Sequence, residues 1–186
     1  PGEHTRTFVR EVLPFELTGA QKRSLRQIIE DTQAGVQMNR LLQGDVGSGK
    51  TVVAVAAMMH AYDSGYQSAF MAPTELLAEQ HYQNLVEYLR PMGMMPHLLV
   101  GGQSKSEREA ILTDLKEGRV PVAVGTHALI QDEVEFNNRG LAVVDEQPRL
   151  GVPQTADMLG QGTQPHITRM TPTPLPHTHP THHNAP

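Results

Sequence analysis

The sequence predicts an α/β fold in which helices cover both faces of a mostly parallel sheet. Three observations support this fold class. Helical and strand patterns alternate from residue 18 to about residue 144, which is typical of parallel sheets. A glycine-rich octapeptide stands between a short apolar segment and an Ala/Val/Met-rich segment, and a later apolar segment ends in two acids. Ligands of such sheets bind at the carboxyl ends of the strands.

Composition places limits on the class of protein. The 186 residues predict one domain with a substantial core, and the absence of Cys excludes disulfides and is compatible with a reducing cytoplasm. No apolar run approaches eighteen residues, so we expect a soluble, cytoplasmic protein without a membrane partner. The net charge of −5 argues against a broadly basic nucleic-acid-binding face. Because residue 1 is Pro rather than Met, we expect an excised fragment.

The expected helices are marked by capping signals and apolar periodicity. Thr18 and Gln21 form a capping box that predicts a helix to about Glu30, and a second box at Ser106 and Glu109 predicts a helix ending near 116–118. Between them, we expect a helix from Val52 to Met59 that stops near Gly65. Another helix should begin at Pro73-Thr74, with one apolar face made of Leu77, His81, Leu85 and Leu89.

The expected strands are short apolar segments between these helices. They are Leu41–Leu42, Ser68–Met71, Leu98–Val100, Val120–Val124 and Leu141–Val144. The last is fully apolar and runs directly into Asp145-Glu146.

The octapeptide fits the phosphate-loop pattern G-x-x-x-x-G-K-[ST]. Its residues are Gly44, Asp45, Val46, Gly47, Ser48, Gly49, Lys50 and Thr51. Between a strand and a helix, such a loop aims consecutive backbone N–H groups and a helix N-terminus at one anion. We expect Lys50 to reach the β- and γ-phosphates and Thr51 to bind Mg²⁺. The alternative is a glycine-rich turn that happens to precede a helix.

Asp145 and Glu146 follow an apolar strand at the edge where ligands of α/β sheets bind. This arrangement suits metal-assisted hydrolysis, with Asp145 holding Mg²⁺ and Glu146 orienting and deprotonating the attacking water. The alternative is a turn that contains two acids and has no catalytic role.

Five segments, in order, resemble the RecG branch of bacterial superfamily-two DNA helicases, over about residues 13–162. They are Phe15–Gln21, Gln43–Thr51, Ala72–His81, Gly125–Ala128 and Asp145–Gln147. The resemblance implies a first RecA-like motor lobe that uses ATP and Mg²⁺ to move on branched DNA. It also implies that Phe15 and Gln21 contact the adenine, and that Thr74, Glu75, Gly102 and Thr126 lie in stretches that touch the DNA backbone.

Each implied role has a simpler rival. Gln21 can serve only its capping box, and Thr74 only as an N-cap. His81 lies on the apolar face of its helix, so we interpret it as a core histidine rather than a ligand. His127 can be a plain loop residue.

The sequence departs from the family pattern after Glu146. Pro148 replaces the family's His, which links nucleotide and DNA sensing through hydrogen bonds that proline cannot donate. Leu150 replaces an aromatic residue, and Thr155 a basic one. Thr168 and Arg169 occupy a place where an apolar strand is expected, and Thr171-Pro172-Thr173 replaces a Thr-Ala-Thr segment.

The carboxyl-terminal segment is rich in Pro and His. Residues 165–186 hold six of the 14 prolines and five of the ten histidines, which predicts irregular or disordered chain. Adventitious metal affinity is the most that His177, His179, His182 and His183 indicate. We therefore expect three parts: a linker over 1–14, the ATP-binding domain over 15–162, and a tail over 163–186.

These observations leave three interpretations of function. The first is a helicase motor lobe; because its second lobe and branch-binding domain are absent from these residues, we expect ATP–Mg²⁺ binding, slow hydrolysis and no unwinding. A missing arginine finger typically costs 10³–10⁵ in rate. The second is another phosphate-loop enzyme such as a small-molecule kinase. The third is a degenerate fragment that keeps the fold without turnover.

Overall fold

The computed structural model describes residues 2–13, 15–34, 39–44, 49–126, 134–137, 139–146 and 166–172. Its helical elements are α1 (Glu3–Thr7), the π-helical segment η1 (Phe8–Val12), α2 (Gly19–Gln33), α3 (Lys50–Asp63), α4 (Glu75–Leu89), the 3₁₀ turn η2 (Arg90–Met92) and α5 (Lys105–Lys116). Its strands are β1 (Asn39–Gly44), β2 (Gln67–Met71), β3 (His97–Leu99), β4 (Val122–Gly125), β5 (Arg139–Asp145) and β6 (His166–Pro172).

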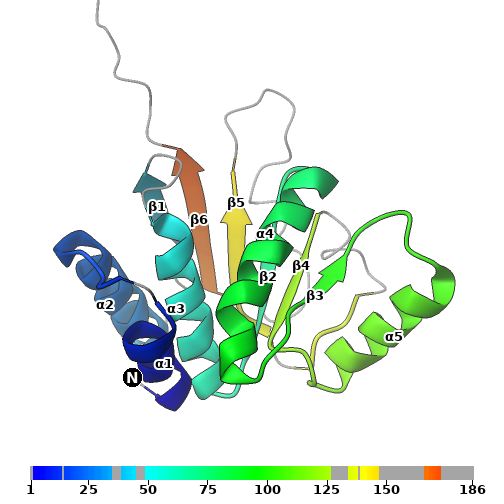
Figure 1. The fold of residues 1–186 in the computed structure, drawn as a ribbon, viewed down its shortest axis with the longest axis horizontal. Helices are drawn as coiled ribbons and strands as arrows, with labels where there is room; N and C mark the ends of the chain where they lie inside the picture. The colour runs from blue at the N-terminus through cyan, green and yellow to red at the C-terminus, as the bar shows by residue number, and fades with distance from the viewer. Residues whose placement is uncertain are drawn as a thin grey trace, which may run out of the picture.

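The strands form one six-stranded sheet in the order β1-β6-β5-β2-β4-β3, and each neighbouring pair is parallel. The arrowheads of β1, β6 and β5 consequently point to the same end of the sheet (Figure 1). Parallel strands need crossover connections, which the helices supply. The predicted α/β class is confirmed, and all five predicted strands are present within one or two residues of their expected limits.

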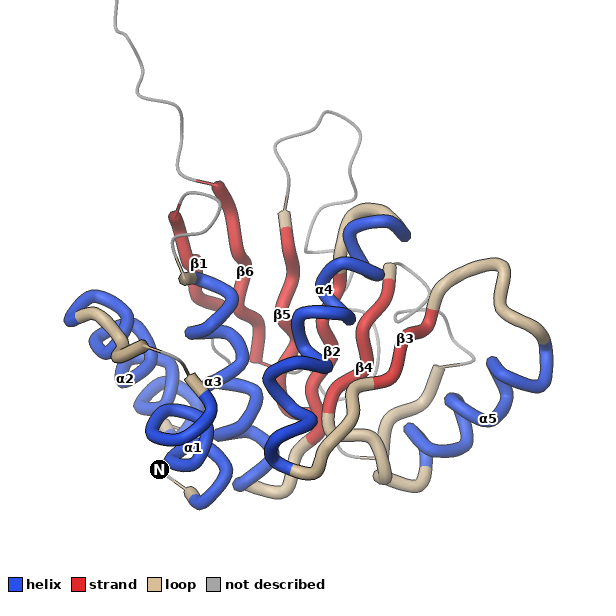
Figure 2. The backbone as a smooth tube through the Cα atoms, viewed as in Figure 1, coloured by secondary structure: helices blue, strands red, loops and turns tan. Residues whose placement is uncertain are grey.

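Helices cover both faces of the sheet, because alternate side chains of each strand enter different cores. Phe70 and Val143 belong to the core under α1–α4, whereas Ala69 and Ala142 belong to the core that contains Leu115 of α5. Figure 2 shows α3 and α4 crossing in front of the strands. α3 is buried on all sides from Val52 to His60, as expected of a helix that is apolar around its whole circumference.

The capping predictions are confirmed at two helices and shifted at a third. Thr18 and Gln21 form both hydrogen bonds of the capping box that begins α2. The hydroxyl of Thr74 accepts from Leu77 N at the start of α4. α5, however, begins two residues earlier than predicted, because the Ser104 hydroxyl accepts from Glu107 N. Ser104 and Glu107 fit the same S-x-x-E pattern as the predicted pair, Ser106 and Glu109.

The amino-terminal segment differs from the predicted linker over residues 1–14. Residues 3–12 are helical, and Phe8 is fully buried against the main core. α1 is too short to be stable alone, so tertiary contacts must hold it. The carboxylate of Asp63, at the end of α3, accepts hydrogen bonds from the backbone N–H groups of His4 and Thr5 in the first turn. Asp63 therefore caps a helix that lies 58 residues earlier in the chain.

The predicted irregular tail over 163–186 is wrong for residues 166–172, which form β6. This strand lies between β1 and β5, with Arg169 opposite Leu41 and Val144. Thr168 is fully buried at its centre. β-Branched Thr suits a strand, and Pro172 stands at the strand's end, where it removes no hydrogen bond from the interior. The sheet therefore extends beyond residue 162, the predicted limit of the main domain, and the His-rich residues 177–183 lie outside the described residues.

Candidate nucleotide and nucleic-acid site

The strand order brings the two predicted halves of a nucleotide site to one edge of the sheet. β1 ends at Gly44, β5 ends at Asp145, and only β6 separates them. Gly44 lies opposite Pro172 and Asp145 opposite Met170 on that intervening strand. Neighbouring strands lie about 4.8 Å apart, so the ends of β1 and β5 are about 10 Å apart. This spacing lets a phosphate loop and an acidic pair serve one ligand.

The phosphate loop itself is described only at its two ends. Asp45, Val46, Gly47 and Ser48 lie outside the described residues, whereas Gly44 ends β1 and Gly49 caps α3. Gly49 has a φ of 86°, in the left-handed region that favours glycine. Lys50 and Thr51 follow in the first turn of α3 and are half-buried. The expected strand before the phosphate-loop sequence and the expected helix after it are thus confirmed.

Gln21 connects the predicted adenine motif to this loop. Its side-chain oxygen accepts from Thr18 N at 2.8 Å, and its side-chain nitrogen lies 3.5 Å from Gly49 O. A Cβ added at Gly49 would overlap the Gln21 amide. The capping role of Gln21 is therefore confirmed, and the same amide reaches the helix end beside the phosphate loop. Phe15, the other predicted adenine contact, exposes 47% of its surface close in sequence to this helix start.

Asp145 makes one side-chain hydrogen bond in the described part of the chain. His81 Nε2 donates to its Oδ2 at 2.7 Å, and the two side chains are only 15% and 11% exposed. The ionised carboxylate can only accept, so Nε2 carries the ring proton. The interpretation of His81 as a core histidine is therefore incomplete. Its position on the apolar face of the helix correctly indicated burial, but only the parallel strand order revealed Asp145 as its partner.

The residues at this edge fit Mg²⁺. A hydroxyl on Thr51 and a carboxylate on Asp145 are hard oxygen donors, and Oδ1 of Asp145 has no partner among the described residues. No cluster of three acidic or histidine side chains occurs in the described ranges. This agrees with the usual binding of Mg²⁺ by one or two protein groups together with substrate phosphates and water. Glu146 is oriented through its backbone, since its N–H donates to Met170 O at 2.8 Å.

The predicted DNA-side residues gather at the carboxyl ends of the other three strands. Thr74 follows β2, Gly102 follows β3 and Thr126 follows β4, and these strands are neighbours. Glu75 is tied to the turn after β3, because its carboxylate accepts from Gly101 N at 3.0 Å. Gly102 has a φ of 80°, which allows a tight turn. The structure thus brings these four residues to one region, while His127 lies outside the described residues.

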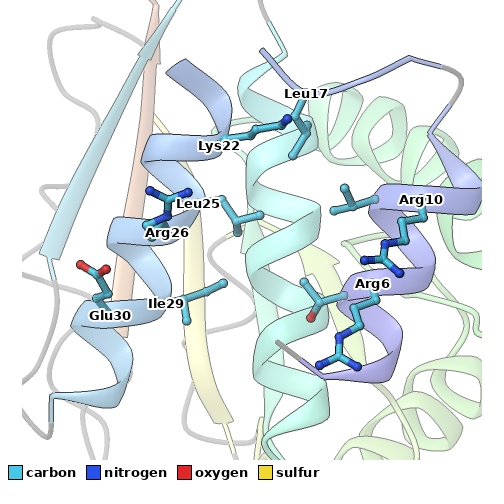
Figure 3. Close-up of a pocket in the computed structure, with 10 residues that line it drawn as sticks. Arg6, Arg10, Leu17, Lys22, Leu25, Arg26, Ile29 and Glu30 are labelled. Carbon is cyan, nitrogen blue, oxygen red and sulfur yellow. The ribbon is translucent and has the colours of Figure 1, made fainter. Parts of the chain in front are cut away.

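Sequence reasoning missed a mainly apolar groove of about 470 Å³, with several basic side chains in its lining, between the N-terminal helices and α2. Figure 3 shows the lining side chains on the two sides of α3, with Arg6 and Arg10 on the N-terminal helices and Leu25 and Ile29 on α2. Val9, Leu17, Leu25 and Ile29 contribute apolar surface, and Arg6, Arg10, Lys22 and Arg26 contribute four positive charges against one, Glu30. Arg6 and Arg10 are four residues apart, as are Lys22 and Arg26, and residues at this spacing share one face of a helix. This pattern could have indicated the groove from the sequence. The groove contains none of the residues predicted to bind nucleotide or DNA.

Taken together, a phosphate-loop strand and an acid-bearing strand separated by one parallel strand define a RecA-like lobe of the P-loop NTPase class. A family model described as DEAD/DEAH box helicase matches residues 18–175. The chain belongs to this family. No described helix has the length and apolar character needed to cross a bilayer.

Within the family, the resemblance to RecG is confirmed by the relatives. The chain is 51% identical over 168 residues to the ATP-dependent DNA helicase RecG of Synechocystis sp., covering 90% of this chain and 20% of that protein. It is 50% identical over 170 residues to that of Aquifex aeolicus, covering 90% and 22%. A solved structure of RecG bound to a three-way DNA junction matches with a TM-score of 0.79 and 44% identity, covering 92% of this chain and 23% of that one. The chain therefore spans about a fifth of the length of the relatives it matches.

Proposed function

We propose that this chain is the ATP-binding motor lobe of an ATP-dependent DNA helicase that acts on branched DNA in recombination and repair, in the cytoplasm. The observation that supports the proposal is that Gly44, where the phosphate-loop sequence begins, and Asp145 end two strands that are separated only by β6, at a single edge of the sheet. The relatives named RecG and the RecG complex with a three-way junction support the choice of DNA as the partner.

In this proposal, the carboxyl edge of the sheet is divided between two ligands. The ends of β1 and β5, with Gln21 and Phe15 beside them, take ATP. Lys50 binds the phosphates, and Thr51 and Asp145 hold Mg²⁺, which would stabilise negative charge on the phosphates. Glu146 orients and deprotonates the attacking water. The ends of β2, β3 and β4 take the DNA backbone through the stretches that contain Thr74, Glu75, Gly102 and Thr126.

The 186 residues alone are proposed to bind ATP–Mg²⁺ without unwinding DNA. A motor of this kind hydrolyses ATP between two lobes, and the arginine that stabilises the transition state comes from the second. These residues contain one lobe, so a DNA-stimulated ATPase rate near that of an intact motor would contradict this part of the proposal.

The test is nucleotide binding by the chain and its Lys50→Ala variant, measured with a fluorescent ATP analogue and Mg²⁺. We expect the variant to bind at least about tenfold more weakly, because a hydrogen bond to a charged group contributes roughly 1.5–3 kcal/mol. Lys105→Ala is the matched control, since Lys105 is 91% exposed and pairs with Glu109 at 3.9 Å. Equal binding by all three proteins would indicate the degenerate, non-binding interpretation.

A second measurement separates the motor lobe from another phosphate-loop enzyme. We expect the chain to bind forked DNA, since the DNA-side residues lie together. A kinase would instead transfer phosphate from ATP to a small acceptor. Phosphoryl transfer to such an acceptor without any binding of forked DNA would reject the motor-lobe proposal.

A further inference from the structure

His81 links two parts of the edge that the sequence treats separately. It lies in the second turn of α4, whose first turn carries Glu75 and whose N-cap is Thr74. Its ring packs against Phe70 of β2, with centroids 4.5 Å apart, and this contact fixes the direction of the ring. The ring then reaches past β2 to Asp145 at the end of the neighbouring strand, β5.

Among the residues that the structure describes, the His81 ring makes one polar contact, to Asp145. Nδ1 is buried and has no hydrogen-bond partner in the described ranges. A ring that served only as core would be replaced without cost by an apolar residue, since its second nitrogen contributes nothing. The single bond to Oδ2 of Asp145 is therefore the contact that a histidine supplies and a leucine would not. It restricts rotation of the carboxylate and engages only one of its two oxygens, Oδ2.

We propose that His81 is a positioning residue of the metal site, whose Nε2–H orients the Asp145 carboxylate for Mg²⁺ and joins it to the helix that begins at Thr74 and Glu75. The proposal rests on the proposed function, because it needs Asp145 to bind the metal. It gives α4 a direct connection from the DNA-side turn to the nucleotide site. Such a connection is notable in a sequence where Pro148 has replaced the family's sensing His.

The test is metal affinity, measured by electron paramagnetic resonance with Mn²⁺ and a non-hydrolysable ATP analogue on the chain. Loss of a hydrogen bond to a metal ligand typically costs 10–100-fold in affinity, so His81→Leu should bind Mn²⁺ at least about tenfold more weakly. His81→Gln should recover most of the affinity, because a Gln side-chain nitrogen reaches as far as Nε2 and donates. His81→Asn, whose amide is shorter, should not recover it.

The control is His4→Leu, which removes a second His–Asp contact of 2.7 Å, at Asp63. It should lower the unfolding midpoint and leave Mn²⁺ affinity unchanged. If His81→Leu does not fold, the comparison between His81→Gln and His81→Asn decides. Wild-type Mn²⁺ affinity in His81→Leu, or equal affinity in the Gln and Asn variants, would overturn the positioning role.

The two proposals fail differently. If Lys50→Ala binds nucleotide as well as the unmodified chain, the proposed function fails. If Lys50→Ala loses nucleotide but His81→Leu keeps its Mn²⁺ affinity, only the role of His81 fails.

Discussion

Two histidine–aspartate pairs of equal length have different surroundings in this molecule. His4 Nδ1 and Asp63 Oδ1 lie 2.7 Å apart, as do His81 Nε2 and Asp145 Oδ2. Asp63 also accepts from His4 N, Thr5 N and the Thr5 hydroxyl, so both of its oxygens are engaged. Asp145 accepts one side-chain bond in the described part of the chain.

The two contact distances are equal, so distance alone does not separate a structural carboxylate from a ligand-binding one. The number of hydrogen bonds that each carboxylate already accepts does separate them. Burial alone would raise the pKa of Asp63, but hydrogen bonds from Thr5 and His4 outweigh it and hold that pKa below its ordinary value. A carboxylate satisfied in this way stabilises the fold. A carboxylate with a single side-chain partner among the described residues, at the edge where ligands bind, is available to a cation.

The largest expected effect is on stability at the first pair. Asp63→Ala should lower the free energy of unfolding by about 3 kcal/mol, because it leaves several donors of α1 without partners. Urea denaturation followed by circular dichroism measures the change. Asp114→Ala is the control, since that carboxylate pairs with Arg119 at the surface, where such pairs contribute at most about 1 kcal/mol. Equal destabilisation by both substitutions would remove the distinction between the pairs.

A smaller effect on stability is expected at the second pair. Asp145→Asn keeps an oxygen that accepts from His81, so the free energy of unfolding should change by less than about 1 kcal/mol. The same variant should lose most of its Mn²⁺ affinity in the presence of an ATP analogue, because the ligand charge is gone. A variant that unfolds far more easily yet still binds Mn²⁺ would show that Asp145 acts like Asp63.

A third expected effect is a pH dependence of stability near the first pair. Burial lowers the pKa of His60 on α3 below its ordinary value of 6.5. The unfolded chain then takes up a proton more readily than the folded one as the pH falls below 6.5. Stability should therefore decrease toward acid, by no more than about 1.4 kcal/mol per pH unit for one proton.

His60→Gln should flatten this decrease between pH 7 and pH 5, as measured by urea midpoints at several pH values. Asp63 adds a separate loss at lower pH. Because its folded pKa is lowered, its contribution is present above the ordinary value of 3.8 and disappears as the pH falls through the folded value. An unchanged slope in His60→Gln would show that another group takes up the proton.

Much of the fold could be predicted because its signals are local. Capping at Thr18 and Thr74 depends on residues three positions away, and both caps are confirmed. The strand–loop–helix around Lys50 was equally readable, since glycine spacing and the flanking apolar segments lie within about twenty residues. The shift of α5 to Ser104 shows the limit of such signals, because two overlapping S-x-x-E patterns compete and backbone geometry chooses between them.

The sequence by itself determined the α/β class, the order of the elements and the types of residue at the strand ends. Only the tertiary structure decided that Asp63 caps α1, that residues 166–172 enter the sheet between β1 and β5, and that His81 meets Asp145. These contacts join residues 58 to 64 positions apart or depend on strand order. A parallel sheet brings such residues together through its crossovers, and nothing in the local pattern of either partner records where the other will lie.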